Sequence, residues 1–308
     1  MVNFEIVLAT YNGSDFLEAQ LNSILPQIGQ GSILVHDDGS TDETVKLLSK
    51  YADNYDCIKI IKGPPCLSAM ANFNFLLGHT TSSYIFFADQ DDVWEDYKIE
   101  VLLKAITFYE SVFGADVPLL VHSDLSLIDE NNERISPSFW EYQKINPRWG
   151  GKFNLLLTQN VVTGCAMIVN RALVGKALPI PREAIMHDHW LALVASGFGY
   201  VKYIDDALVR YRQHGNNSVG AKSFDFEYIL HRLLEVINHR KVLSEIQEKS
   251  SAQAKVFAER YTDSRSTGLA VEYSSLPYLS RIKRVKKLFK NRFNKIGVIR
   301  NVAWYLFV

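Results

Sequence analysis

Carboxylates and other polar side chains gather in three short segments, each of which directly follows an apolar run. The segments are Thr10-Tyr11-Asn12, Asp37-Asp38-Gly39 and Asp89-Gln90-Asp91-Asp92. Hard divalent cations take oxygen ligands, and Mg²⁺ is typically held by one or two carboxylates together with substrate phosphates. The third segment could therefore hold a cation, or its acids could cap a following helix. The acids of the second segment could accept hydrogen bonds from a ribose or a base, or could belong to a loop before a helix.

The residues around these segments predict the elements that would position them. Apolar runs of strand length lie at 4–9, 33–35, 58–61, 84–88 and 119–122. Apolar residues recur at helical spacing between them, at 16–25, 45–48, 73–77 and 95–113, and Thr41 is expected to cap the second of these helices. This alternation predicts an α/β fold with a mostly parallel sheet covered by helices on both faces. Because ligands bind beyond the carboxyl ends of such strands, we expect the three polar segments to form one site.

The alternation weakens between residues 131 and 160, which predicts a loop-rich insertion. Trp140, Tyr142 and Trp149 in this insertion could stack on acceptor sugars or pack the insertion onto the core. After it we expect a strand over 161–169, a helix near 189–196, a strand near 200–204 and long helices over 224–260.

The composition excludes several classes of protein. With 47% apolar and 22% charged residues the chain is globular, and its formal net charge of −1 selects no nucleic-acid partner. Cys57, Cys66 and Cys165 lack the spacing of a disulfide framework or a zinc site, which indicates a reduced protein in the cytoplasm. Glycine-rich phosphate-binding motifs are absent from the sequence, so a metal would have to neutralise the phosphates of a bound nucleotide.

Six segments together resemble family 2 glycosyltransferases, which have the GT-A fold. They are Ala9–Gly13, Asp37–Asp42, Ala88–Trp94, Thr163–Cys165, His187–Trp190 and Tyr211–Asn217. The resemblance covers about residues 3–220, and the forms DQDDVW and YRQHGNN resemble the bacterial rhamnosyltransferase-type branch, which builds cell-surface and cell-wall polysaccharide. It implies a Rossmann-like sheet flanked by helices, followed by a helical C-terminal extension.

The resemblance also implies roles for the matching residues. The nucleotide pocket would be lined by Thr10, Tyr11, Asn12, Asp37, Asp38, Lys62, Asn72, Asp89 and Gln90. Asp38 would contact the base or ribose. Ala71 stands where the family has an arginine, so one expected contact with the donor is missing.

The metal, the base and the acceptor side are implied in the same way. Mn²⁺ or Mg²⁺ would be held by Asp89, Asp91 and His214, with Asp91 as the direct ligand. Asp188 would be the general base, although taken alone it is expected to cap the helix that begins at His189. The acceptor or the diphosphate would be contacted by Arg212, Trp190, Thr163 and Gly164.

These roles imply a metal-dependent transferase that inverts the anomeric centre. The first choice of donor is dTDP-L-rhamnose, and a UDP-hexose or UDP-N-acetylhexosamine is the alternative. The acceptor would be a saccharide, which we expect to be lipid-linked. A nucleotidyltransferase would also use carboxylates and a metal, but the basic triphosphate loop that it needs near the first strand is absent from the sequence. A non-catalytic sugar-binding module would have no use for a base beside a metal.

The end of the chain is strongly basic, since residues 281–300 contain nine basic and no acidic side chains. Apolar residues recur there at helical spacing, which predicts one amphipathic helix that lies on a membrane surface, packs on the acidic body or forms an oligomer contact. We expect no signal peptide at the first residues, and the apolar runs of the sequence are too short to span a bilayer. We therefore divide the chain into a catalytic domain (1–220), a helical extension (221–280) and a basic tail (281–308), located in the cytoplasm at the inner face of the cell membrane.

Overall fold

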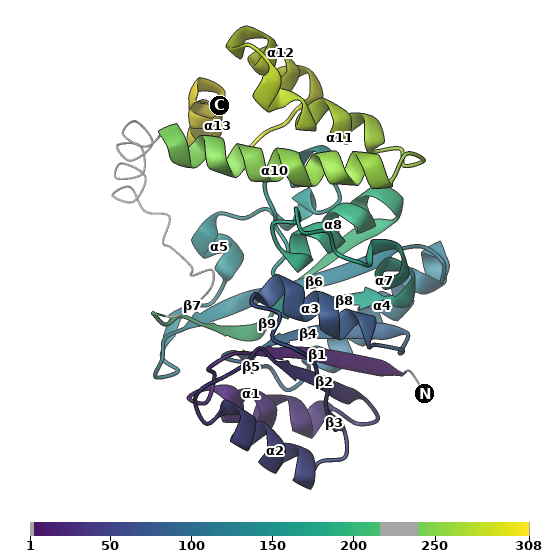
Figure 1. Cartoon of the computed structure of the whole chain (residues 1–308), viewed down its shortest axis with the longest axis vertical. Helices are drawn as coiled ribbons and strands as arrows, with labels where there is room; N and C mark the ends of the chain where they lie inside the picture. The colour runs from purple at the N-terminus through teal and green to yellow at the C-terminus, as the bar shows by residue number, and fades with distance from the viewer. Residues whose placement is uncertain (1–2, 216–239, 308) are drawn as a thin grey trace.

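The computed structural model describes residues 3–215 and 240–307, which form a nine-stranded sheet with helices on both faces (Figure 1). The first four strands are β1 (Phe4–Thr10), β2 (Ser32–Asp37), β3 (Ile58–Ile60) and β4 (Tyr84–Asp89). They lie in the order β3-β2-β1-β4, and every neighbouring pair of these four is parallel. The helices that connect them are α1 (Leu17–Ile24), α2 (Thr44–Asn54) and α3 (Ala69–Gly78). This half of the sheet confirms the predicted α/β alternation.

Side chains of the central strands alternate between two hydrophobic cores. On β1, Ile6 and Leu8 pack on the face covered by α1, α2 and α4 (Lys98–Phe113), whereas Val7 points to the opposite face. That opposite face is covered by α3, α7 (Arg171–Ala177) and α8 (His187–Phe198). Successive strand residues point to opposite faces, so a strand buried on both faces must be mostly apolar, as β1 is from Ile6 to Ala9.

The second half of the sheet is mixed, so it contains antiparallel pairs beside a parallel one. Its strands are β5 (Val93–Trp94), β6 (Leu119–Ile128), β7 (Arg134–Ser136), β8 (Met167–Asn170) and β9 (Tyr200–Arg212). β8 lies between β4 and β6 and is antiparallel to both. β6 and β9 are parallel, whereas β5 and β7 pair antiparallel with β9 and β6.

Two local predictions were wrong. The strand predicted over 161–169 is only β8, because a 3-10 turn, Gly164–Ala166, precedes it. That turn packs against His187, whose Nε2 would lie 2.6 Å from a Cβ added at Gly164. Thr41 does not cap α2, since the helix begins at Thr44 and Asp42 accepts a hydrogen bond from the Thr44 backbone N–H at 3.0 Å.

The insertion predicted over 131–160 contains only short elements. They are β7, α5 (Phe139–Gln143), a 3-10 turn at Pro147–Trp149 and α6 (Phe153–Leu156). Trp140 is buried, and Tyr142 and Trp149 are partly buried against the two cores. The aromatic residues of the insertion therefore pack it onto the body of the protein.

Beyond β9, the described residues 240–307 contain the α-helices α10 (Arg240–Arg260), α11 (Thr267–Ser274), α12 (Arg281–Asn291) and α13 (Val298–Phe307) (Figure 1). Of the long helices predicted over 224–260, residues 224–239 lie outside the described part. The single amphipathic helix predicted for the tail is wrong. The chain turns between α12 and α13, where Arg292 and Gly297 have φ of 53° and 85°. Among the described residues, we find no helix with the length and apolarity that crossing a membrane requires.

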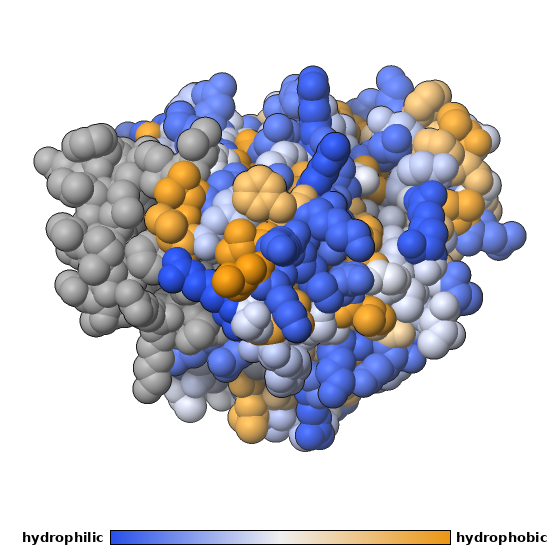
Figure 2. All heavy atoms as spheres, turned by 90° about the horizontal axis from the view of Figure 1, so that it is seen from above, coloured by the Kyte–Doolittle hydropathy of each residue, from blue (hydrophilic) through white to orange (hydrophobic). Residues whose placement is uncertain are grey.

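The two faces of α12 have different environments. On the inner face Leu288 is fully buried, and Lys287 Nζ forms an ion pair with Glu272 of α11 at 2.5 Å. Packing of the tail on the acidic body is therefore confirmed for this face. On the outer face the side chains of Ile282 and Phe289 are 72% and 66% exposed. The end of the molecule that carries these helices shows apolar patches among hydrophilic side chains (Figure 2).

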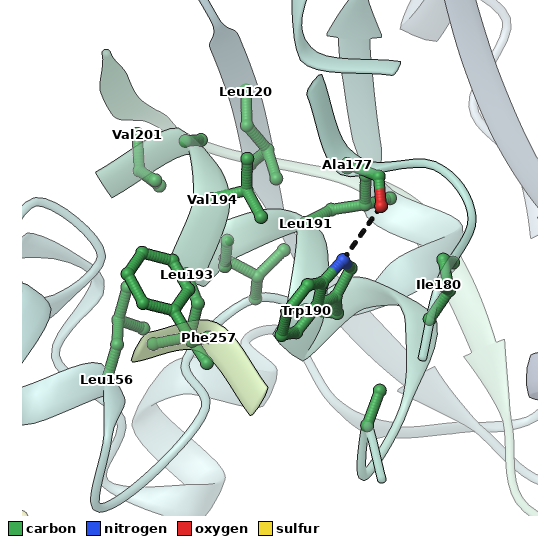
Figure 3. Close-up of a cluster of buried hydrophobic side chains, with 14 of the residues drawn as sticks. Leu120, Leu156, Ala177, Ile180, Trp190, Leu191, Leu193, Val194, Val201 and Phe257 are labelled. Carbon is green, nitrogen blue, oxygen red and sulfur yellow. Dashed lines mark hydrogen bonds between the residues drawn. The ribbon is translucent and has the colours of Figure 1, made fainter. Parts of the chain in front are cut away.

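The helix α10 shares a core with α8. Phe257 of α10 lies among Trp190, Leu193 and Leu156 (Figure 3), with its ring centroid 6.1 Å from that of Trp190. The Trp190 indole donates a hydrogen bond to the Ala177 carbonyl at 3.0 Å. The C-terminal helices therefore complete the core on which α8 rests.

Candidate active site

The ends of β1, β2 and β4 coincide in the sheet. Register places Thr10 opposite Asp37 and Ala9 opposite Asp89, so the three polar segments leave the sheet at one edge. The Thr10 hydroxyl donates to Asp37 at 2.9 Å, and the Ser40 backbone N–H donates to the same carboxylate at 2.8 Å. Asp37 therefore holds the first two loops together.

Asp38 joins the end of β2 to the loop that follows β3. Its Oδ1 accepts hydrogen bonds from the backbone N–H groups of Cys66 and Leu67, the latter at 2.9 Å. Leu67 has φ of 63° and a side chain that is 86% exposed beside this carboxylate. Oδ2 accepts no hydrogen bond from residues 3–215 and 240–307, so it is available to a ligand.

Gln90 and Asn12 fix the loops after β4 and β1. The Gln90 side chain accepts from Tyr11 N at 2.8 Å and donates to Tyr11 O at 2.9 Å. Asn12 Oδ1 accepts from Thr41 N at 2.8 Å. The ring of Tyr11 is 56% exposed, so a ligand can reach it.

Lys62 and Asn72 differ in exposure. Lys62 is exposed on the loop after β3. Asn72 is buried, and its amide bonds to His36 Nδ1 at 3.0 Å and to the His36 carbonyl at 3.1 Å. Asn72 therefore supports the end of β2 from below rather than presenting its amide to a nucleotide.

Buried acids lie at the end of β4. Ligand atoms of Asp89, Asp92 and Cys165 all lie within 4.8 Å of one another. Burial raises the pKa of Asp89 to about 7, with further contributions from the charges of Asp91 and Asp188, and burial also raises the pKa of Asp92 well above its usual range. Asp92 Oδ2 is buried without a hydrogen-bond partner among the residues described. Converging carboxylates with an unsatisfied buried oxygen fit a divalent cation.

Lys98 lies beneath these acids and was not predicted from the sequence. Its ammonium is fully buried, donates to the Cys165 carbonyl at 2.6 Å and lies 3.3 Å from the centroid of the Trp94 ring. Burial lowers the pKa of Lys98 to about 7, although the charges of Asp92 and Asp89 oppose this effect. A lysine in the first turn of a helix is ordinarily exposed, so the sequence held no signal for this role.

Asp91 and His214 meet across the site. His214 Nε2 lies 2.8 Å from Asp91 Oδ2, and both side chains are partly exposed, at 12% for His214 and 15% for Asp91. The imidazole packs against the ring of Phe16, with centroids 4.9 Å apart. The two polar side chains thus form the accessible rim of the buried acidic cluster.

Arg212 and Trp190, which the sequence assigned to the acceptor or the diphosphate, are buried in positions that support the site. The Arg212 guanidinium donates to the carbonyls of Asp91, Asp129 and Glu130 at 2.9, 3.1 and 3.2 Å. These bonds stabilise the loop that carries Asp91. Trp190 is fully buried in the core of α8, where a sugar cannot reach it.

Asp188 lies at the N-terminus of α8, where backbone N–H groups stabilise negative charge. Its carboxylate accepts from Gly164 N at 3.1 Å and from His189 N at 2.5 Å. Burial nevertheless raises its pKa to about 7. Gly164 therefore serves as backbone support for this carboxylate, whereas the Thr163 carbonyl accepts from Ala166 N at 3.1 Å.

The histidines on either side of Asp188 point into the core. His187 packs between Phe73 and Phe87, with ring centroids 4.1 and 5.5 Å away, and burial lowers its pKa to about 3. His189 Nε2 bonds to the Leu156 carbonyl at 2.7 Å. Asp188 is thus the residue of the His187-Asp188-His189 segment that faces the site, and its charge acts on Asp89.

Known proteins resemble this chain in sequence and in fold. The profile of Glycosyl transferase family 2 matches residues 5–173, so the chain belongs to that family and is a glycosyltransferase. It is 28% identical to the dTDP-rhamnosyl transferase RfbG of Shigella flexneri over 80% of this chain and 84% of that protein. It is 26% identical to the UDP-Glc:alpha-D-GlcNAc-diphosphoundecaprenol beta-1,3-glucosyltransferase WfgD of Escherichia coli over 64% of this chain and 75% of that one.

Solved structures with the same fold include TarS 1-349 of S. aureus in complex with UDP-GlcNAc. That chain superposes with a TM-score of 0.58 at 14% identity, over 94% of this chain and 73% of its own length. The mannosyltransferase PcManGT from Pyrobaculum calidifontis, in complex with GDP-Man and Mn²⁺, gives a TM-score of 0.52 at 14% identity, over 94% and 79%. The GT-A fold predicted from the motifs is confirmed.

Proposed function

We propose that the protein transfers a sugar from a nucleotide donor to a saccharide acceptor with inversion of the anomeric centre. The observation that carries the proposal is the meeting of two acidic groups at one edge of the sheet. One group is the cluster after β4, and the other is Asp188 at the N-terminus of α8, whose charge acts on Asp89. The ends of β1 and β2, with Asp38 Oδ2 and the exposed Tyr11 ring, would hold the nucleoside beside them.

In the reaction, Asp188 takes the proton of an acceptor hydroxyl as its oxygen attacks the anomeric carbon. The bond between that carbon and the diphosphate oxygen breaks, and the nucleoside diphosphate leaves with the electron pair. A pKa of about 7 suits a general base, because the carboxylate is ionised at neutral pH yet still basic. Mn²⁺ or Mg²⁺ held by Asp89 and Asp91, with His214 at the rim, would stabilise the negative charge on the leaving diphosphate.

The donor proposed first is dTDP-L-rhamnose. It is supported by the 28% identity to a dTDP-rhamnosyl transferase over four-fifths of the chain. A UDP-hexose or UDP-N-acetylhexosamine is the second candidate, favoured by the glucosyltransferase relative and by the complex of TarS with UDP-GlcNAc.

A donor panel tests the function. The purified protein is incubated with dTDP-rhamnose, UDP-glucose, UDP-galactose and UDP-GlcNAc plus Mn²⁺ or Mg²⁺, and release of nucleoside diphosphate is measured with and without EDTA. We expect release from one donor in the panel, and loss of release with EDTA. Release that persists in EDTA would exclude a role for the metal. If no donor of the panel releases nucleoside diphosphate, with or without metal and with a lipid-linked saccharide present, the proposed transferase activity would be excluded.

We further propose that the acceptor is lipid-linked and that the outer face of α12 binds the inner face of the cell membrane. Ile282 and Phe289 are exposed there, with the basic side chains of Lys283, Lys286 and Lys290 around them. Each basic residue near an anionic leaflet contributes about 1 kcal/mol to binding. The absence of acidic residues in 281–300 is complementary to such a surface.

Vesicle sedimentation tests this surface. We expect the protein to bind vesicles rich in anionic lipid, and the double substitution Ile282→Glu and Phe289→Glu to abolish binding. The control is Val271→Glu on α11, which is also exposed, at 53%, but lies outside the basic segment. Equal binding by all three proteins would overturn the proposal, and a dimer that dissociates only in the double variant would assign the face to an oligomer contact instead.

A further inference from the structure

A set of hydrogen bonds joins the turn between α12 and α13 to the loop after α6. The Thr158 hydroxyl lies 2.5 Å from the Asn294 carbonyl, and the Lys295 ammonium donates to the Thr158 carbonyl. The Ile296 backbone N–H donates to Gln159 Oε1 at 3.3 Å. These contacts link positions that are about 137 residues apart in the chain.

The same loop continues to the candidate base, because the Gly164 backbone N–H donates to Asp188 Oδ2 at 3.1 Å. The Asn160 side chain also lowers the pKa of Asp188 against the effect of burial. Asn160 is held in turn by Val162, since its Nδ2 donates to the Val162 carbonyl at 2.8 Å and its Oδ1 accepts from Val162 N at 3.0 Å. The loop therefore lies between the C-terminal turn and Asp188.

The C-terminal side of this contact is tightly packed. The Lys295 ammonium lies 4.6 Å from the centroid of the Trp304 ring, and the Trp304 indole donates to the Phe293 carbonyl at 3.0 Å. Both aromatic side chains are buried. A second contact comes from α10, where Gln253 Oε1 accepts from Ile185 N at 2.9 Å, three residues before Asp188.

We infer that the turn between α12 and α13 positions Asp188 for proton transfer. Lys295 and the Ile296 backbone hold Thr158 and Gln159, so that the loop from Thr158 to Gly164 keeps the Gly164 backbone N–H bonded to the carboxylate. Lys295 and Gln159 are positioning residues, because neither touches the reacting atoms. The inference rests on the proposed role of Asp188 as general base. It gives the C-terminal helices a part in turnover that is separate from their outer face.

The titratable groups that surround Asp188 are the same in wild type and in the variants proposed here, apart from Lys295 itself. They are His187 and His189 on α8, Asp89 at the end of β4, and Lys295, whose charge acts on His189. Because both histidines are held neutral by burial, a change in the contacts between this loop and Asp188 is expected to dominate any change in the ionisation of Asp188.

The test compares Gln159→Leu and Lys295→Met with Lys255→Met, a control at an exposed position on α10. We expect the first two to lower kcat about 10-fold to 100-fold, since a displacement of about 1 Å costs that much, with donor KM within about twofold of wild type. The apparent pKa of the acid limb in the pH profile of kcat should rise by about one unit, because a hydrogen bond to the carboxylate is weakened. Asn160→Ala is expected to shift this pKa in the same direction. Activity is normalised to the folded fraction, measured by near-UV circular dichroism.

Two results would overturn the inference. In the first, activity falls only in proportion to the folded fraction and the acid limb of the pH profile stays where it is in wild type. In the second, a rise in donor KM accounts for the whole loss of activity. If Lys295→Met does not fold, Gln159→Leu decides, because it keeps the buried ammonium. Asp188→Asn in the same series separates the two proposals. Near-normal turnover of Asp188→Asn would refute the proposal that Asp188 is the general base. If Asp188→Asn is inactive while the other variants behave like wild type, only the proposed role of the turn is refuted.

Discussion

Replacing Asp188 by Asn removes the proposed base with little change in shape. General-base catalysis contributes roughly 10²–10⁴-fold, so we expect kcat to fall by that factor, equivalent to about 3–5 kcal/mol of transition-state stabilisation. Donor binding should be unchanged, because the nucleoside is expected at the ends of β1 and β2, whereas Asp188 lies at the N-terminus of α8. The assay is nucleoside diphosphate release at saturating acceptor, with donor affinity measured separately by calorimetry.

The pH profile sharpens this prediction. With the pKa of Asp188 at about 7, roughly a tenth of the molecules hold the carboxylate ionised at pH 6 and nine-tenths at pH 8. Wild-type kcat should therefore rise about tenfold between these values, and the residual activity of the Asn variant should not follow that rise. A variant with near-normal turnover, or one that keeps the same acid limb, would refute the role of Asp188.

Stability separates this effect from misfolding. An acid whose pKa is higher in the folded protein than in the unfolded chain binds more protons when folded, so its contribution to stability is lost as pH rises from the unfolded value, near 3.8, through about 7. At pH 8 wild type has lost that contribution, whereas the asparagine of the variant is never charged. We therefore expect the variant to have a Tm at pH 8 no lower than that of wild type, measured by calorimetry.

Three further predictions test the other parts of the site. Asp91→Asn should abolish the stimulation of activity by Mn²⁺ while leaving the fold intact by circular dichroism; normal Mn²⁺ dependence would exclude Asp91 as a ligand. Trp190→Phe should lower the free energy of unfolding by about 2 kcal/mol in urea titrations, because a hydrogen bond is lost and the ring is smaller. Donor and acceptor KM should be unchanged, and a specific rise in acceptor KM would indicate that Trp190 contacts the sugar. Arg212→Gln should lower the free energy of unfolding by about 3 kcal/mol, because it breaks a buried hydrogen-bond network. If the variant keeps the wild-type Tm and loses only affinity for the diphosphate, Arg212 contacts the ligand instead.

The strands and their end segments could be predicted from the sequence because each signal is local. An apolar run of strand length followed by polar residues, as at Val35–Asp38 or Phe87–Asp91, contains both the element and the place where it leaves the sheet. Parallel pairing of neighbouring strands then brings these ends together. The direction of β8 could not be predicted, because it is defined by pairing with β4 and β6, which lie far from β8 in the sequence.

Individual site residues were harder to place, because residue type alone does not say which way a side chain points. Arg212 and Trp190 lie in motifs beside the site, yet both side chains turn inward. Asn72 likewise bonds to His36 instead of facing outward. Lys98 showed the opposite problem, since only the fold reveals that this lysine is buried under Asp89 and Asp92.

The tail shows a further limit of periodicity. The apolar spacing of Ile282, Phe289 and Phe293 suits one long helix, but Arg292 and Gly297 adopt left-handed backbone and divide it. A left-handed Gly carries little steric cost, so Gly297 was the available signal for the break. The division directs Leu288 and Phe293 inward while Ile282 and Phe289 stay exposed.

The core shared by α8 and α10 has a consequence for biosynthesis. Domains generally fold as they emerge from the ribosome, the N-terminal part first. Trp190 and Leu193, however, meet Phe257 only after the chain has been translated well past the sheet (Figure 3). A nascent chain that ended after β9 would expose this apolar surface of α8, so the newly made protein should become active late, when its final helices close over that surface.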